Sequence, residues 1–234
     1  MKYPLYLVLL LAAACGDDDT TMMTPDAPPA AQTIAISGTA SQRSTSGSVP
    51  VEGATVAAYA SSDESTPLAT GTTDANGAFT LTIDTHGVAV DGYIKATMAG
   101  MVDTYWYPAG PLTADYADAG LNMLAPQTLD LLANTLCRAN QDTAMGMVAL
   151  EVADASRTPV AGATIASDPA ASLYCYDSGG FPSPSATATD PDGIGYMFNI
   201  TGDATVSADK SGSTFTSHSI KVRGGALTTT LIQP

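Results

Sequence analysis

The sequence predicts an all-β fold, built from two tandem β-sandwiches joined by one short helix. Its 234 residues contain two motifs that recur in the same order, at 50–56 and 73–79 and again at 159–165 and 189–196. Residues after these motifs alternate between two faces with a period of two, which is typical of a strand with one buried face. Charged residues make up only 13% of the chain, and Ala, Thr, Ser and Gly are abundant, which favours short strands and tight turns over long helices.

The first motif reads Pro-Val-Glu-Gly-Ala-Thr-Val at 50–56 and Pro-Val-Ala-Gly-Ala-Thr-Ile at 159–165. Proline has a fixed φ and no amide hydrogen, so it suits the entry to a strand or a turn. The glycine allows a backbone conformation that other residues avoid. Ala54, Val56 and Ala58 then occupy every second position, which predicts a strand.

The second motif reads Thr-Asp-Ala-Asn-Gly-Ala-Phe at 73–79 and Thr-Asp-Pro-Asp-Gly-Ile-Gly-Tyr at 189–196. Asp and Asn side chains bond to their own backbone in tight turns, and Gly supplies a positive φ. Phe79, Leu81 and Ile83 alternate with threonines directly behind the first copy. We therefore expect a turn followed by a strand.

These motifs together resemble the carboxypeptidase regulatory-like domain, a small seven-stranded sandwich that is related to transthyretin and often grouped with immunoglobulin-like folds. Each half also contains an opening strand with a glycine, Gly38 or Gly146, and the first half has a strand from Tyr93 that leads to Gly100. The second half departs from the pattern, because Gly195 precedes its aromatic residue and the corresponding late strand lacks the tyrosine.

The resemblance implies two immunoglobulin-like, transthyretin-like β-sandwiches, at 33–125 and 143–234. It implies no activity, because this family is defined by its fold. A chain of 234 residues can hold one or two domains, and the repeat favours two. The formal net charge is −15 and the chain has only eight Lys and Arg residues, so we expect no nucleic-acid partner, because phosphate binding requires clustered Lys and Arg.

Residues 1–15 resemble the signal peptide of a bacterial lipoprotein. Lys2 precedes a short apolar run, and Ala-Ala-Ala-Cys-Gly follows at 12–16. The resemblance implies that Cys15 becomes the diacylated first residue of the mature chain. Ordinary secretory cleavage, which leaves Cys15 as a free thiol, is the alternative. An exposed thiol on an exported chain would be open to oxidation, which favours lipidation.

A disordered acidic and proline-containing tether is predicted at 16–32, because this segment has an acidic run at 17–19 and almost no residues that could enter a core. We expect the acidic run to be solvated rather than to bind calcium, since it lacks the turn glycine and the spacing of a calcium loop. The expected partner of this end is a lipid bilayer, and Gly16 after Cys15 is compatible with the outer membrane.

A linker helix is predicted within 126–142. Pro126 suits the first turn of a helix, and Leu129, Leu132 and Leu136 recur at helical spacing. This leucine stripe could bind a partner protein. We expect instead that it packs between the two sandwiches and sets their angle.

A disulfide between Cys137 and Cys175 is predicted by elimination. If Cys15 is lipidated, only these two thiols remain in an oxidising compartment. The bridge would connect the predicted helix to the longer loop of the second half. Such a bridge typically adds roughly 2–4 kcal/mol of stability.

Two aromatic segments suggest an alternative role in ligand binding. Tyr105, Trp106 and Tyr107 are consecutive, and Tyr174 and Tyr176 lie in the longer loop of the second half. Exposed aromatic rings on such loops can stack against sugars. Alternation within a strand would instead bury Trp106 in the core and place Tyr105 and Tyr107 on the other face, and we favour that arrangement.

No catalytic motif is recognisable in the sequence: it contains no Gly-x-Ser-x-Gly, phosphate-binding loop, His-Glu-x-x-His or Cys-x-x-Cys. His86 and His218 are the only histidines, and they lie in different repeats. The turns of the second motif echo the start of a calcium loop but lack its closing glutamate, so we expect turns without a metal. The residues concerned are Asp74, Asn76, Asp190 and Asp192.

The function expected from these observations is that of a monomeric, non-enzymatic lipoprotein of the bacterial cell envelope, without cofactor, which acts as a scaffold, adhesion or binding module. A carbohydrate-binding accessory protein at the cell surface is the alternative. Its partners would be other envelope proteins or glycans.

Overall fold

A computed structural model describes residues 30–44 and 47–234, so the predicted signal peptide, Cys15 and most of the tether lie outside the described residues. Within these described residues, sixteen strands, one α-helix and one π-helical turn follow in chain order. Their bounds are β1 (Thr33–Ser44), β2 (Gly47–Pro50), β3 (Thr55–Ala60), β4 (Ala69–Thr72), β5 (Ala78–Asp84), β6 (Gly92–Thr97), β7 (Thr104–Tyr107), β8 (Tyr116–Met123), α1 (Pro126–Asp130), η1 (Leu131–Leu136), β9 (Gly146–Val152), β10 (Thr164–Asp168), β11 (Leu173–Ser178), β12 (Phe181–Ser183), β13 (Ile194–Ile200), β14 (Gly202–Asp209), β15 (His218–Val222) and β16 (Leu227–Ile232). The predicted all-β fold class is confirmed.

The first half is a sandwich of two sheets around its own core. Strand β1 pairs with β2, β5 and β8 in one sheet, and β4, β3, β6 and β7 follow one another in the other. The expected alternation holds in β5, where Phe79, Leu81 and Ile83 are buried and the threonines between them are exposed. The core between the sheets also contains Trp106.

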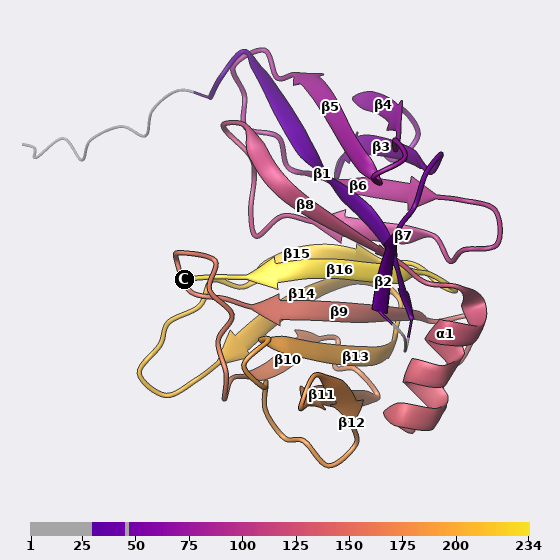
Figure 1. Cartoon of the computed structure of the whole chain (residues 1–234). Coiled ribbons are helices and arrows are strands. Elements are labelled where there is room, and N and C mark those ends of the chain that lie inside the picture. Colours follow the sequence, from indigo (N-terminus) through magenta and orange to yellow (C-terminus); the bar gives the residue numbers. More distant parts are fainter. Residues whose placement is uncertain (1–29, 45–46) are drawn as a thin grey trace, which may run out of the picture.

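The second half repeats this two-layer arrangement. Strands β10, β14 and β15 form one layer, and β12, β11, β13, β9 and β16 form the other. Its core contains Val148, Leu150, Val206 and Ile220, all buried. Figure 1 shows the first half above the second, with the β1–β2 hairpin reaching from one to the other.

One nine-stranded sheet runs through both halves, because β16 pairs in parallel with β9 on one side and with β7 on the other. This connection differs from the expectation that only a helix joins two separate sandwiches. As edge strands of separate sheets, β7 and β16 would expose unpaired backbone groups. By pairing with each other they form hydrogen bonds between these groups. The predicted division of the chain into units at 33–125 and 143–234 therefore stays a prediction.

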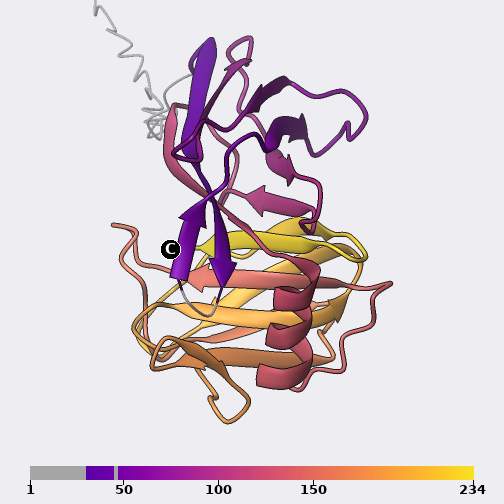
Figure 2. The same ribbon diagram turned by 45° about the vertical axis from the view of Figure 1, so that its right-hand side comes forward.

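The helical segment lies on the outer face of the second half's sheet, as Figure 2 shows. Pro126 opens α1 as expected, but the segment from Leu131 to Leu136 continues as a π-helix. Ala133 packs in a small cluster with Met147 and Phe198 of that sheet. The expectation that the helix fills the space between the sandwiches is therefore wrong, because strand pairing already occupies the junction.

The threonine of the second motif connects it to the first motif in both halves. Thr73 Oγ1 donates a hydrogen bond to Val51 O at 2.6 Å and accepts one from Ala54 N at 2.9 Å. Thr189 makes the same pair of bonds with Val160 O and with the amide of the matching alanine, at 2.6 and 3.0 Å. Both hydroxyls are buried, so this residue explains why the two motifs recur together.

The glycine of the second motif lets its turn lie against the first strand of each half. Gly77 and Gly193 have φ values of 72° and 71°, a conformation that other residues rarely adopt. A Cβ atom would lie 2.3 Å from Ala40 O in the first half and 2.5 Å from Val152 O in the second. Only glycine fits at these two positions.

Candidate functional site: the junction between the two halves

Strand β7 supplies three aromatic residues at the junction. Trp106 points into the core of the first half, whereas Tyr105 and Tyr107 belong to the core of the second half. The three side chains are 7%, 7% and 5% exposed. Alternation along this strand is therefore confirmed, and these residues do not form the exposed sugar-stacking surface of the alternative hypothesis.

The tyrosines of the longer loop are also engaged within the fold. Tyr176 is buried, and its hydroxyl accepts a hydrogen bond from Ile165 N at 3.1 Å. The Tyr174 hydroxyl accepts hydrogen bonds from Ser167 N and Ala171 N, each at 3.2 Å. Both residues fasten β11 to β10. Burial makes Tyr176 unavailable for the stacking of the alternative hypothesis, whereas Tyr174 is only partly buried.

Arg223 of the second half enters a group of tyrosines from the first half. Its guanidinium carbon lies 4.1 Å from the ring centroid of Tyr105 and 4.5 Å from that of Tyr93. Its Nη1 also donates a hydrogen bond to the Tyr107 hydroxyl at 3.3 Å. An arginine held between aromatic faces interacts favourably with both rings and brings its charge into a half-buried site.

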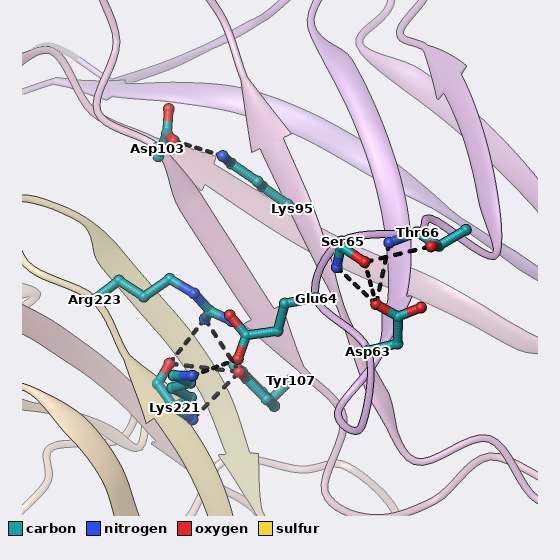
Figure 3. Close-up of polar contacts among 9 residues, drawn as sticks. All are labelled: Asp63, Glu64, Ser65, Thr66, Lys95, Asp103, Tyr107, Lys221 and Arg223. Atoms are coloured by element: carbon teal, nitrogen blue, oxygen red, sulfur yellow. Dashed lines mark hydrogen bonds and ion pairs between the residues drawn. The ribbon is translucent and has the colours of Figure 1, made fainter.

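Glu64 connects the first half to two cations of the second half, as Figure 3 shows. Its carboxylate lies 2.6 Å from Lys221 Nζ and 3.1 Å from Arg223 Nη2. The hydrogen bond from Lys221 is the largest cause that lowers the pKa of Glu64. The neighbouring Asp63 accepts hydrogen bonds from Ser65 and Thr66, which lower its pKa to about 2 and hold this loop in place.

The junction therefore joins the halves by strand pairing, by aromatic packing around Arg223 and by ion pairs. Sequence reasoning missed the ion pairs, because Glu64 and Lys221 are 157 residues apart and nothing local indicates that they meet. These contacts all connect one half to the other, so this arrangement is suited to holding two halves in a fixed relative orientation.

The predicted disulfide between Cys137 and Cys175 is confirmed. The two Cα atoms are 5.9 Å apart, and both residues are 1% exposed. The bridge connects the end of η1 to β11 and lies within the small core under the helix. It fixes the helical segment to the outer face of the second sandwich.

In the calcium-like turns, aspartate side chains accept hydrogen bonds from backbone amides of the same turn. Asp74 accepts hydrogen bonds from Asn76 N and Ala78 N, both at 2.8 Å, and Asp192 accepts one from Ile194 N at 3.0 Å. Within the described residues, no group of three or more His, Cys, Asp or Glu side chains is arranged to hold a metal ion.

The other carboxylate of the second turn and the two histidines lie apart from the junction's ion pairs. Asp190 accepts a hydrogen bond from Gly179 N at 2.6 Å. His86 is mostly exposed and lies 3.2 Å from Asp84, whereas His218 Nε2 is 2.7 Å from Thr230 Oγ1. Burial lowers the pKa of His218, which favours its neutral form.

Asp177 is a buried carboxyl group of β11 whose pKa is strongly raised. It is 7% exposed, and its Oδ1 has no hydrogen-bond partner. Burial, followed by a hydrogen bond and repulsion from Asp192, raises its pKa to about 7. Asp190 adds repulsion, while a hydrogen bond from Tyr196 acts in the opposite direction.

We expect Asp177 to make the fold less stable as the pH rises. The unfolded chain releases this proton near pH 4 and the folded chain near pH 7, so the free energy of unfolding should fall between these values and level off above them. Asp177→Asn should remove this fall. Urea unfolding of both proteins from pH 4 to 8 tests this, and the difference between the profiles cancels the contribution of His218. Parallel profiles would contradict the prediction.

Comparison with known proteins finds no matching family model and no matching curated protein. Among solved structures, the chain is similar to the shaft pilin SpaA from Lactobacillus rhamnosus GG, with 16% identity, a TM-score of 0.28, and coverage of 86% of this chain and 98% of the pilin. The minor pilin of Streptococcus agalactiae gives 12% identity, a TM-score of 0.28, and coverage of 86% and 94%.

The Bacillus anthracis TIE protein gives 10% identity and a TM-score of 0.28, and it covers 86% of this chain. This chain spans 34% of that protein's length. At TM-scores this low the similarities carry no argument about function. No helix in the described residues has the length and apolar character needed to cross a membrane.

Proposed function

We propose that this chain is a non-enzymatic lipoprotein of the bacterial cell envelope, and that its two halves act together as one rigid scaffold or adhesion unit. The observation that carries the proposal is the continuous sheet, in which β16 joins β9 of the second half to β7 of the first. A sheet that crosses the junction transmits force and orientation through backbone hydrogen bonds. This property suits a spacer that projects a surface away from a membrane.

The contacts beside the sheet support the same role. Thr229 and Thr230 of β16 donate hydrogen bonds to Tyr105 O and Tyr107 O at 3.4 and 3.2 Å, which reinforces the seam. The Glu64 ion pairs add a second set of contacts across the junction. Interfaces between domains are often small and permit motion, whereas these combined contacts oppose it.

Export is supported by the disulfide, because stable structural disulfides form in oxidising compartments such as the bacterial periplasm. Membrane attachment is supported by the Ala-Ala-Ala-Cys-Gly sequence at 12–16, which resembles a lipoprotein cleavage site with Cys15 as the acceptor. The segment at 16–32 would then place the folded halves at a distance from the outer membrane. A non-enzymatic role is supported by the ion pairs of the junction, in which Lys221 and Arg223 both engage the carboxylate of Glu64.

Lipidation predicts that Cys15→Ala releases the protein from the membrane. The full chain is produced in a Gram-negative host that is fed an alkyne-labelled fatty acid, and membranes are separated on a density gradient. The unchanged protein should carry the label in the outer-membrane fraction, and Cys15→Ala should lose both the label and the membrane association. Cys175→Ala serves as the control, because it removes another thiol and should keep the label. An unlabelled wild-type chain would overturn the proposal.

A further inference from the structure

A cleft of about 520 Å³ lies between the two halves, on the side of the nine-stranded sheet that carries the β1–β2 hairpin. Figure 2 shows this hairpin in front of the second half's sheet. One wall comes from β1 and β8 of the first half, and the other from β9, β13 and β16 of the second. The cleft exists only because the halves are fixed together, so neither repeat could form it alone.

Polar side chains with unused hydrogen-bonding capacity line this cleft. Glu151 is partly buried, yet its carboxylate makes no ion pair or hydrogen bond within residues 30–44 and 47–234. Burial, and then the charge of Asp192, raise the pKa of Glu151. Asn122 uses its Oδ1 to accept a hydrogen bond from Arg43 Nε at 3.1 Å, and its amide hydrogens have no partner in the described part of the chain. Partly buried groups of this kind gain from a ligand that can donate and accept hydrogen bonds.

Three side chains in contact keep one wall of the cleft in place. The rings of Trp106 and Tyr116 have centroids 5.0 Å apart, and the guanidinium of Arg157 lies 4.3 Å from the Tyr116 centroid. Arg157 also donates a hydrogen bond to Ala117 O at 3.1 Å. The wall is therefore preformed, which lowers the entropic cost of binding.

The charges of the cleft balance each other. Arg43 and Arg157 are opposed by Asp118 and Glu151, although the whole chain carries a formal net charge of −15. A strongly anionic or cationic ligand would find no excess of opposite charge here. Hydroxyl groups, which donate and accept, match a mixed lining of carboxylate, amide and guanidinium groups.

The geometry also disfavours an extended peptide that would add a strand to β8. Asp118 has a φ of 65°, which interrupts the regular backbone of β8. The carbonyl oxygen of Ala117 already accepts a hydrogen bond from Arg157. An added strand needs a free and regular row of backbone donors and acceptors. A glycan needs no such row.

We propose that this cleft binds a short, uncharged oligosaccharide. The sugar hydroxyls donate hydrogen bonds to the Glu151 carboxylate and accept them from the Asn122 amide and the Arg43 guanidinium. Trp106 is 7% exposed, so only a small part of the indole lines the cleft and stacking on its ring face is not required. This inference goes beyond the scaffold role, and it does not depend on lipidation of Cys15.

A glycine in the lining allows the cleft to be blocked without removing a polar group. A Cβ atom on Gly120 would meet no atom within 4 Å, and its φ lies outside the positive range, so Gly120→Phe should fold and fill the cleft. Gly110 has the same properties and lies outside the cleft. Gly110→Phe is therefore a matched control.

The test uses the fluorescence of Trp106, because the chain contains a single tryptophan. The purified full chain is titrated with maltohexaose, cellohexaose, xylohexaose and chitohexaose, and with heparin and tetra-alanine as charged and peptide comparisons. At least one neutral sugar should give a saturable change in emission. Gly120→Phe and Glu151→Gln should each weaken that binding by about tenfold or more, while Gly110→Phe keeps it, and thermal unfolding checks that each variant is folded.

Absence of a response to all four sugars would overturn the proposal. Equal binding by the two glycine variants would overturn it too, because the sugar would then sit elsewhere. A response only to heparin or to tetra-alanine would assign the cleft to an anionic or peptide ligand instead. None of these outcomes bears on the lipidation of Cys15, which is measured separately.

Discussion

Replacing Cys137 and Cys175 together with alanine is expected to lower the free energy of unfolding by about 4 kcal/mol. The bridge closes a segment with a sequence separation of 38 residues, and restricting that segment in the unfolded chain is the main source of its stabilisation. The helical segment rests on the outer face of the sheet through a small core that contains both cysteines. Loss of the disulfide should therefore loosen the helical segment before the rest of the fold.

Urea unfolding followed by circular dichroism measures this effect, and hydrogen exchange shows where the structure loosens. Exchange should increase in the segment from Leu131 to Leu136 before it does in β9. Treating the unchanged protein with a reductant under mild denaturation should reproduce the loss. Cys15→Ala serves as the control with unaltered stability. If the free energy of unfolding differed by less than about 1 kcal/mol, the disulfide would not stabilise the fold and other contacts would hold the segment in place.

Thr73→Val is expected to cost about 3 kcal/mol, because one change of nearly equal volume leaves two backbone groups without partners. The amide of Ala54 and the carbonyl of Val51 both bond to this hydroxyl, and the site is 4% exposed, so water cannot replace it easily. Thr189→Val should have a similar effect in the second half, where the same two bonds recur.

Thr73→Ser keeps the hydroxyl and should restore most of the lost stability. Thr82→Val lies on the exposed face of β5 and should change stability by no more than about 0.5 kcal/mol. Thermal and urea unfolding of the three variants separate the hydrogen bonds from the effect of volume. If Thr73→Val and Thr82→Val were equally stable, the hydroxyl would not be what connects the two motifs.

Local patterns in the sequence predicted much of each half. Alternation placed Phe79, Leu81 and Ile83 inside and assigned Trp106 to the opposite face from its two tyrosine neighbours. Counting the thiols led to the Cys137–Cys175 bridge. These predictions succeed because they depend on local or compositional properties. Alternation and turn residues depend on neighbouring positions, and the disulfide follows from the small number of cysteines.

Other features could not be read in this way. The tyrosines at 105, 107, 174 and 176 looked available to a ligand, but the shared sheet and the backbone contacts of β10 enclose most of them. The helix looked suited to the space between the sandwiches, yet β16 takes that place by pairing with β7. In both cases the position of the side chains or helix depends on contacts with a part of the chain that is distant in sequence.

Sequence alone thus determined the strand-rich character of this protein, its internal repeat, and the turn glycine with a positive φ in the second motif of each half. Only the tertiary structure decided how the halves meet, which cations Glu64 binds, and that a cleft with balanced charge opens between β8 and β16. The physical reason is one of range. Turns and alternation depend on neighbouring residues, whereas Glu64 and Lys221, 157 positions apart, meet only after two sheets have joined.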